Sequence, residues 1–291
     1  MAMDDHLNSS NCCTKKRKSC FEDLTTSTQG RVRLKRQARN INTNEFDASN
    51  SQILIWNCQG GSRLTVLYLN RLLSKHHLDI FFIFETKNNL IKSKAILRHL
   101  HNYHVEVILA TGRSGGLWFG YSKNVLLSIF SITDHSIYCT VKNRPHCLEW
   151  DLLCFYVHPS LSARTQFRDE IKSFLENSTR PWCICGDLNL IVSSNEKQGG
   201  CAVSRGETSL LSQAISECNL IDLGSSSPPF TWTNRRDESH LISKRLDRFL
   251  ANQDWIHEFP HVHVRKLASC GSDHHPILLS TKRSWQNSAQ L

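Results

Sequence analysis

Five consecutive apolar residues, Ile80-Phe81-Phe82-Ile83-Phe84, are followed directly by an acid, Glu85. A short, continuous apolar run of this kind is typical of a strand that is buried on both faces. Glu85 is poorly placed for packing in such a strand. It is well placed on the rim of a sheet, where functional side chains gather. The stretch therefore indicates a fold built on a buried sheet, with polar chemistry at one sheet edge.

The same arrangement, a polar residue at the end of an apolar strand, recurs elsewhere in the chain. It is seen in Asn57 after Ile53–Trp56, in Asp187 and Asn189 after Trp182–Cys185, and in Asp273 and His274 before Pro276–Leu279. One acid at a strand end is usually an exposed loop start, and Asn57, Asp187 and Asn189 could simply close turns. Four such clusters in one domain favour a shared site.

Apolar runs and amphipathic stretches alternate from residue 52 onward. The runs that predict strands are Ile53–Trp56, Leu78–Phe84, Val105–Ala110, Gly116–Tyr121, Val125–Ile132, Leu148–Val157, Trp182–Cys185, Arg245–Phe249 and Pro276–Ser280. Between them, Phe167, Ile171 and Phe174 have helical spacing, and Ser204-x-x-Glu207 is typical of a helix start. Hairpin-like pairs between residues 105 and 157 favour mixed or antiparallel sheets. We predict an α/β sandwich with sheets inside and helices outside.

Length and charge suggest one domain with a basic extension. The chain has 291 residues, 40% of them hydrophobic, which is enough for one large core. We predict a disordered arm over residues 1–50, the domain over 51–282 and a short tail over 283–291. The net charge is +9, and residues 1–40 carry nine Lys/Arg against four Asp/Glu. This balance favours a polyanionic partner such as nucleic acid. The run Lys15–Lys18 fits a nuclear localisation signal, although a solvated tail accounts for it equally well.

The cysteines fit a reduced, intracellular protein. The sequence has 12 cysteines, no secretory signal, and no apolar run near the roughly 18–20 residues that a membrane helix needs. Several cysteines lie in strand-like runs, where a thiol behaves as a small hydrophobe. Zinc ligation by Cys12-Cys13, Cys183-x-Cys185 or His261-x-His263 with Cys270 is disfavoured, because these groups lack paired C-x₂₋₄-C units.

The polar residues suit the hydrolysis of a phosphodiester. That reaction needs a cation to neutralise the phosphate, a base to activate water, and donors that hold the phosphoryl group in line. Mg²⁺ takes oxygen ligands, and Glu85 with a second carboxylate would suit it. His274 is the candidate base, and Asp247 is a plausible partner that would orient its ring.

Six short motifs occur in one order along the chain. They are Trp56-Asn57-Cys58-Gln59-Gly60, Phe84-Glu85-Thr86-Lys87, Gly186-Asp187-Leu188-Asn189, Phe230-Thr231-Trp232-Thr233-Asn234, Arg245-Leu246-Asp247 and Ser272-Asp273-His274-His275-Pro276. The ordered set resembles the endonuclease/exonuclease/phosphatase superfamily, which includes the abasic-site endonucleases and type I DNases. The chain also resembles the endonuclease domain of plant LINE-type non-LTR retrotransposons. Three further segments carry this likeness: Gly115–Trp118, Tyr156–Pro159 and Ser243–Leu250. The likeness covers about residues 52–281.

The resemblance implies a four-layer α/β sandwich with two packed mixed β-sheets flanked by helices. It also implies a Mg²⁺-dependent, DNA-nicking endonuclease, in which Mn²⁺ can replace Mg²⁺, leaving a 3′-hydroxyl and a 5′-phosphate. In a retroelement that 3′-hydroxyl would prime reverse transcription. A full element of this type continues into a reverse transcriptase, whereas this sequence ends shortly after its last predicted strand.

The resemblance also implies a role for each matching residue. Asn57, Glu85 and Asp273 would bind or position the metal. The residues expected at the reacting phosphate are Tyr156, Asp187, Asn189, His274 and its partner Asp247. His274 would serve either as base or as phosphate ligand. Trp232 is a candidate for contact with DNA, or a core residue, and Arg164 either contacts phosphate or lies exposed on a helix.

Two alternative functions remain open from the sequence. The chain could act on RNA or on inositol phosphates, which are other substrates of the superfamily. It could instead be a non-catalytic, transposon-derived remnant that binds nucleic acid through its basic arm. Nothing in the sequence indicates an oligomeric state.

Overall fold

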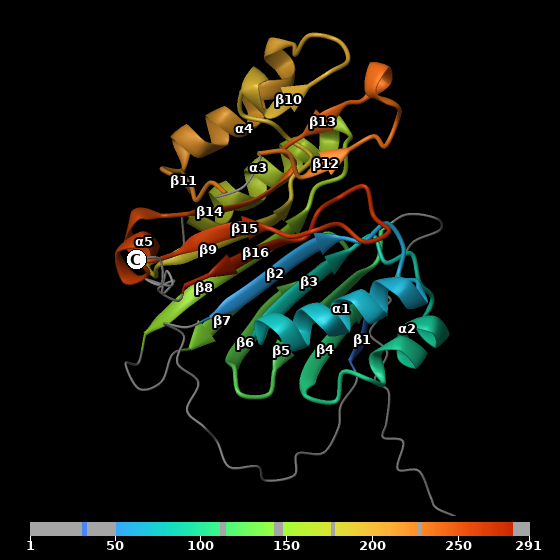
Figure 1. Cartoon of the computed structure of the whole chain (residues 1–291). Helices are drawn as coiled ribbons and strands as arrows, with labels where there is room; N and C mark the ends of the chain where they lie inside the picture. Colours follow the sequence, from blue (N-terminus) through green and yellow to red (C-terminus); the bar gives the residue numbers. More distant parts are fainter. Residues whose placement is uncertain are drawn as a thin grey trace, which may run out of the picture.

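Two β-sheets pack face to face, and helices cover both outer faces of the pair (Figure 1). This computed structural model describes residues 31–33, 51–110, 115–142, 148–175, 178–225 and 229–281. The helices α1 (Arg63–His76) and α2 (Leu90–Leu97) lie on one side. The helices α3 (Leu161–Leu175) and α4 (Arg205–Glu217) lie on the other. The predicted four-layer α/β sandwich is confirmed.

Within the described residues, the first sheet has seven strands and mixed directions. Its order is β1 (Arg31–Arg33), β4 (Tyr103–Ile108), β5 (Leu117–Ser122), β3 (Ile80–Phe84), β2 (Gln52–Asn57), β16 (Ile277–Ser280) and β15 (His263–Lys266). Only β2 and β3 are parallel to each other among these neighbours. The apolar run that precedes Glu85 thus forms a central strand of this sheet.

The second sheet has six strands in the part of the chain that the structure describes. Its order is β11 (Ile221–Asp222), β14 (Asp247–Ala251), β9 (Trp182–Asp187), β8 (Glu149–Tyr156), β7 (Ser136–Lys142) and β6 (Leu126–Ile132). The strands β8 and β9 are parallel, and the other neighbours are antiparallel. A small third sheet joins β10 (Lys197–Gln198), β13 (Ser243–Lys244) and β12 (Trp232–Thr233).

Alternating side chains of the central strands feed separate apolar layers. In β2, Ile53 and Ile55 point into the core between the sheets, while Leu54 and Trp56 pack against α1. The second sheet has the same division, because Cys183 and Cys185 face the inter-sheet core and Ile184 faces the α3 and α4 layer. A strand covered on both faces must be apolar throughout, which explains the unbroken runs. The predicted packing of cysteines as small hydrophobes is confirmed here.

Capping side chains set the helix starts. Ser62 and Thr65 form a capping box at α1, and the predicted box of Ser204 and Glu207 is present at α4. Asn252 accepts a backbone hydrogen bond at the start of α5 (Gln253–Glu258). Such contacts satisfy backbone N–H groups that have no partner within the helix.

One strand boundary differs from the sequence predictions, and other points were not predicted or lie outside the described residues. The strand expected at Arg245–Phe249 begins at Asp247, because Arg245 and Leu246 form the passage from β13 to β14. The strand β1 lies within residues 1–50, the segment predicted to be a disordered arm. The other residues of that segment, including Lys15–Lys18, and the tail 283–291 lie outside the described residues, so these predictions stay open. In the described part, every helix is too short or too polar to cross a membrane.

Candidate active site

The polar strand ends meet at one edge of the two sheets. Asn57 pairs with Phe84 in register, so Glu85 follows directly beside it. In the second sheet Asp187 pairs with Tyr156 on one side and with Asp247 on the other. Packing of β2 on β9 brings the two sets together. Residues that are distant in the sequence therefore share one small region.

Glu85 is the centre of a polar group at the end of the first sheet. Its Oε1 accepts hydrogen bonds from the Tyr156 hydroxyl at 2.8 Å and from Asn57 Nδ2 at 3.1 Å. Its Oε2 lies 2.8 Å from Lys87 Nζ. Burial raises the pKa of Glu85, but the contacts with Lys87, Asn57 and Tyr156 outweigh it and lower the pKa below its ordinary value. Glu85 is therefore ionised at neutral pH.

Asn57 connects the two sheets. Its Nδ2 donates to Glu85 and also to Asp187 Oδ2, at 3.0 Å, and its side chain is almost fully buried. Its Oδ1 accepts from the backbone N–H of Gln59 at 3.2 Å. The turn and the site contact are thus compatible roles of one amide, since each uses a different end of it.

Asp187, Asp247 and His274 form a buried group at the end of the second sheet. His274 Nδ1 lies 2.9 Å from Asp247 Oδ2, and His274 Nε2 lies 3.7 Å from Asp187 Oδ2. All three side chains are nearly inaccessible to solvent. The predicted partnership of His274 with Asp247 is present. The neighbouring His275 instead lies 3.0 Å from the Leu267 carbonyl, which separates the packing histidine from the site histidine.

This burial shifts the proton affinities of the group. Burial raises the pKa of Asp187 to about 7, while the positive charge of His274 opposes the rise. Burial lowers the pKa of His274, but the carboxylates of Asp247 and Asp187 outweigh it and raise the pKa to about 10. At neutral pH His274 is therefore an imidazolium that can donate from both ring nitrogens.

Four non-glycine residues of the site have left-handed backbone. The φ angles are +49° at Gln59, +51° at Glu85, +52° at Lys87 and +49° at Asn189. Such angles are uncommon outside glycine and gather at functional sites, where they aim side chains that a regular strand could not. Gly186 has a related role, since a Cβ there would lie 1.8 Å from the Phe155 carbonyl oxygen. Only glycine allows β9 to carry Asp187 this close to β8.

Asp273 and Trp232 lie beside the buried group. Asp273 Oδ2 accepts from Gln59 Nε2 at 2.6 Å and from Trp232 Nε1 at 2.9 Å. Trp232 is half-buried and pairs with His274 through an isolated backbone bridge. Its indole N–H thus orients Asp273, while a contact of its ring with DNA stays a prediction.

Asn189 and Arg164 support the Asp187 loop. The Asn189 N–H donates to Asp187 Oδ1 at 3.1 Å, and its Nδ2 donates to the Val157 carbonyl at 2.8 Å. Arg164 donates from Nη2 to the Asn189 carbonyl at 3.1 Å. These contacts hold the loop in place. Phosphate contact by either residue stays a prediction.

Four further residues shape the site without having been assigned roles from the sequence. Lys87 pairs with Glu85, and Gln59 with Asp273. Ser272 donates from Oγ to the Asn57 carbonyl at 2.6 Å and accepts from the His274 N–H. Thr231 Oγ1 accepts from the N–H groups of Leu246 and Asp247, both at 3.0 Å. All four lie inside the six ordered motifs. Lys87 has its partner within its own motif, whereas Gln59, Ser272 and Thr231 each contact a segment that is distant in the sequence.

The donor set fits a hard divalent cation. The carboxylate oxygens of Glu85 and Asp273 are ligands that Mg²⁺ prefers. Asn57, predicted to bind or position the metal, faces Glu85 with its Nδ2 and therefore fits the positioning role. At Glu85, Lys87 already supplies a positive charge. In the buried group, Asp247 Oδ1 has no hydrogen-bond partner in the described structure. Asp187, Asp247 and His274 also lie close enough to hold a metal. We favour Glu85, because His274 Nδ1 already contacts Asp247 at 2.9 Å and an imidazolium beside Asp187 would repel a second cation there.

Known structures show the same fold. The endonuclease domain of TRAS1, a telomere-specific non-LTR retrotransposon, matches with a TM-score of 0.60 and 16% identity, over 79% of this chain and 97% of that one. The AP endonuclease LMAP from Leishmania major gives 0.65 and 15%, over 84% and 91%. The 3′ phosphatase NExo from Neisseria, in a structure bound to product DNA hairpin, gives 0.60 and 14%, over 81% and 100%.

These identities are low, so the structural similarity concerns the fold. Comparison with curated protein sequences finds no match. A family model does match, over residues 54–274, which is most of the chain. That range includes all the residues of the site described above. The chain belongs to the endonuclease/exonuclease/phosphatase family.

Proposed function

We propose that the chain is a Mg²⁺-dependent phosphodiester hydrolase that nicks DNA and leaves a 3′-hydroxyl and a 5′-phosphate. The observation that carries the proposal is the amide of Asn57, which joins Glu85 to Asp187 at 3.1 and 3.0 Å. A partly exposed carboxylate and a buried Asp–His–Asp group thereby face one space. DNA as substrate agrees with the net charge of +9 and with the retrotransposon and AP endonucleases among the structural relatives.

The residues divide the reaction between them. Glu85 and Asp273 would hold the metal, with Asn57 positioning the Glu85 carboxylate, and the metal when bound neutralises charge on the phosphate and on the leaving oxygen. Asp187 would orient the attacking water and accept its proton. His274, held by Asp247, would donate a hydrogen bond to a phosphate oxygen, since its imidazolium form suits a donor better than a base. The Tyr156 hydroxyl and Asn189 would hold the remaining oxygens in line.

Relaxation of supercoiled plasmid tests the proposal. We expect purified protein to nick the plasmid with Mg²⁺ or Mn²⁺, and EDTA to stop the reaction. DNA ligase should reseal the nicks, because it requires both a 3′-hydroxyl and a 5′-phosphate. Absence of nicking across Mg²⁺ and Mn²⁺ titrations would refute the activity, and nicks that ligase cannot seal would refute the proposed end chemistry.

Substrate class is tested with the same preparation. Turnover of DNA, RNA and a phosphoinositide, measured side by side, should be fastest for DNA. Preference for RNA or for phosphoinositide would keep the reaction class and replace the substrate. DNA binding that survives His274→Ala, together with inactivity of the parent chain, would point to a non-catalytic binding remnant.

A further inference from the structure

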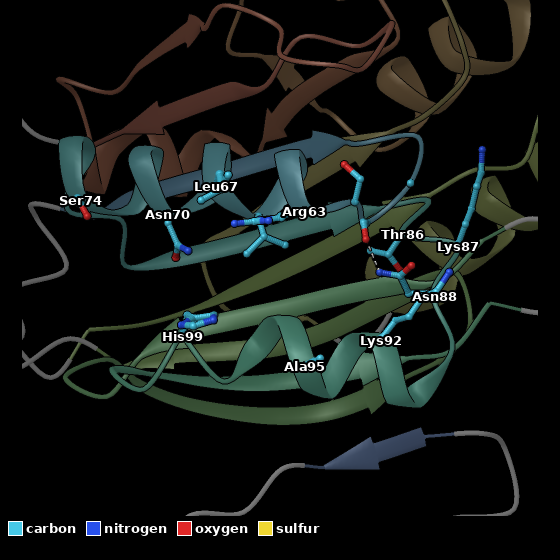
Figure 2. A pocket seen from close by; sticks show the side chains of 14 residues that line it. Arg63, Leu67, Asn70, Ser74, Thr86, Lys87, Asn88, Lys92, Ala95 and His99 are labelled. Atoms are coloured by element: carbon cyan, nitrogen blue, oxygen red, sulfur yellow. Dashed lines mark hydrogen bonds between the residues drawn. The ribbon is translucent and has the colours of Figure 1, made fainter.

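A groove runs along the outer flank of the first sheet, between α1 and α2. Its volume is about 980 Å³, and it begins at the Gly60–Arg63 turn beside the site (Figure 2). Lys87 lines the groove and also pairs with Glu85 at 2.8 Å. The groove and the candidate active site therefore share Lys87.

Facing stripes of the two helices form the walls. On α1, Arg63, Leu67, Asn70 and Ser74 follow one another at helical spacing and line the groove. Lys92, Ala95 and His99 line it from α2 and the residues that follow this helix. The α1 stripe extends along about 16 Å of helix.

The charges of the groove are of one sign. Its lining includes Arg63, Lys87, Lys92 and His99, and no Asp or Glu is present among the described residues that line it. Neither Arg63 nor Lys92 forms a salt bridge within the described part of the chain, and both side chains are exposed. Both residues also stand in the first turn of a helix that has no acid there, where the helix dipole disfavours a cation. A bound anion would compensate for this arrangement.

We infer that the groove holds the phosphate backbone of DNA next to the cleaved bond. This inference rests on the proposed function. Backbone phosphates of one strand follow each other at about 3.4 Å along the duplex axis, so the α1 stripe can accompany about five nucleotides. Lys92 and Arg63 provide charge, while Asn70 and Ser74 provide the neutral donors that commonly contact phosphate. The position of Lys87, which lines the groove and pairs with Glu85, favours the substrate over an acidic protein partner.

Charge reversal within α2 tests the groove with a matched control. The probe is a labelled duplex of arbitrary sequence, about 30 base pairs long, and binding is measured by anisotropy in EDTA so that no turnover is needed. Lys92→Glu should raise Kd about tenfold at low salt, and Lys92→Ala should reduce the slope of log K against log salt by about one. Lys94→Glu makes the same charge change on α2 at a residue outside the groove, and its Kd should stay within about twofold of wild type.

A change in the stability of α2 would not produce weaker DNA binding in Lys92→Glu alone. Lys92→Glu adds an acid to the first turn of α2, which should stabilise the helix, whereas Lys94→Glu adds one to the last turn, which should weaken it. Loss of binding in Lys92→Glu alone therefore reports on the groove. Equal Kd values for the two variants would overturn the inference.

A gain of binding provides the second arm. Ser74→Arg, at the far end of the groove, should tighten duplex binding several-fold and steepen the salt slope by about one. Asn124→Arg adds the same charge in the exposed turn between β5 and β6 and should have the smaller effect. Equal gains would contradict a strand path along α1.

The outcomes separate this inference from the proposed function. If nicking fails while Lys92→Glu still weakens duplex binding, the groove stands and the activity falls. If nicking succeeds while Lys92→Glu and Ser74→Arg leave duplex binding unchanged, the groove inference falls alone. A labelled poly-Glu peptide that loses affinity in Lys92→Glu, with duplex binding unchanged, would overturn DNA as occupant in favour of a protein.

Discussion

The two halves of the site differ in their contact with water and in their partners. Glu85, at the end of the first sheet, is partly exposed and is held by a flexible lysine and by two neutral donors. Asp187, Asp247 and His274, at the end of the second sheet, are buried and contact one another. Only the Asn57 amide is bonded to both halves in the described structure.

This difference suits the two halves to different tasks in the proposed reaction. An accessible carboxylate with an exchangeable cation beside it can take up and release a metal ion. A dry Asp–His–Asp group holds protons and hydrogen-bond directions with little reorganisation, and charges act more strongly there because water is excluded. We therefore expect substitutions in the two halves to differ in how they respond to metal and in what they cost in stability.

Removal of charge from the buried half should have the largest effect. Asp187→Asn keeps the size of the side chain but removes the oxygen that can accept a proton. We expect nicking to slow by about 10³-fold. Because burial disfavours the Asp187 charge, as its raised pKa shows, the melting temperature should not fall.

Parallel measurement of nicking rate and thermal unfolding checks this prediction. DNA binding in EDTA serves as the control and should change little. If the loss of nicking rate in Asp187→Asn is explained by a loss of folded protein, the proposed role of Asp187 at the attacking water is contradicted.

Buried ion pairs next to Asp247 should stabilise the buried half of the site more than exposed ion pairs do. Arg248 follows Asp247 in β14 and is fully buried, with 2.8 Å contacts to Glu196 and to Asp222. Arg248→Met leaves Arg245 as the cation paired with these acids among the described residues. It should cost about 3 kcal/mol in the free energy of unfolding, because it breaks a buried ion network. Arg168→Ala, which removes an exposed pair with Asp169, should cost less than about 0.5 kcal/mol. Urea unfolding of both variants decides, and similar small losses would count against a rigid support.

Metal should compensate for damage in the exposed half only. Glu85→Gln removes the charge of the proposed metal ligand, so nicking at ordinary Mg²⁺ should fall by about 10²-fold and recover in part at higher Mg²⁺ or Mn²⁺. His274→Ala should lose activity without such recovery. Rates measured across a metal titration compare the two variants directly. Recovery of both, or of neither, would remove the distinction between the halves.

Local patterns were sufficient to predict the layers and to single out polar residues that the structure brings together. Continuous apolar runs identify strands that are covered on both faces, and a polar residue directly after such a strand has to lie at the sheet edge. Asn57, Glu85 and Asp187 follow this rule, and the structure brings them together. The partnership of His274 with Asp247 was also expected, and it is present at 2.9 Å.

Contacts between distant segments were beyond local patterns. The Asn57 bridge depends on how the two sheets pack, which no single stretch encodes. The contact of Lys87 with Glu85 is local, but the sequence alone suggests a solvated lysine. The left-handed backbone at Lys87, which accompanies this contact, has no signal in the sequence. The two-residue strands β12 and β13 are too short for any periodicity. Their pairing, and with it the place of Trp232, results from tertiary contacts.

The smallest expected effect concerns a histidine behind the exposed half. The His135 carbonyl accepts a hydrogen bond from the Tyr156 N–H, and its ring lies 2.8 Å from Glu170 and 2.7 Å from Asp134. The Glu170 carboxylate raises the pKa of His135 to about 9 against the effect of burial, with a further contribution from Asp134. A pKa raised in the folded state stabilises the fold fully below about pH 6.5, and this stabilisation is lost as pH rises through about 9.

Because the ring is partly exposed, solvent screening reduces the change to about 1 kcal/mol in the free energy of unfolding. Urea unfolding at about pH 6.5 and about pH 9 measures it, and His135→Gln isolates the contribution of this one group. The difference in stability between wild type and variant should shrink at the higher pH. If that difference is the same at both pH values, the His135–Glu170 pair is not a charged support of the strand that carries Tyr156.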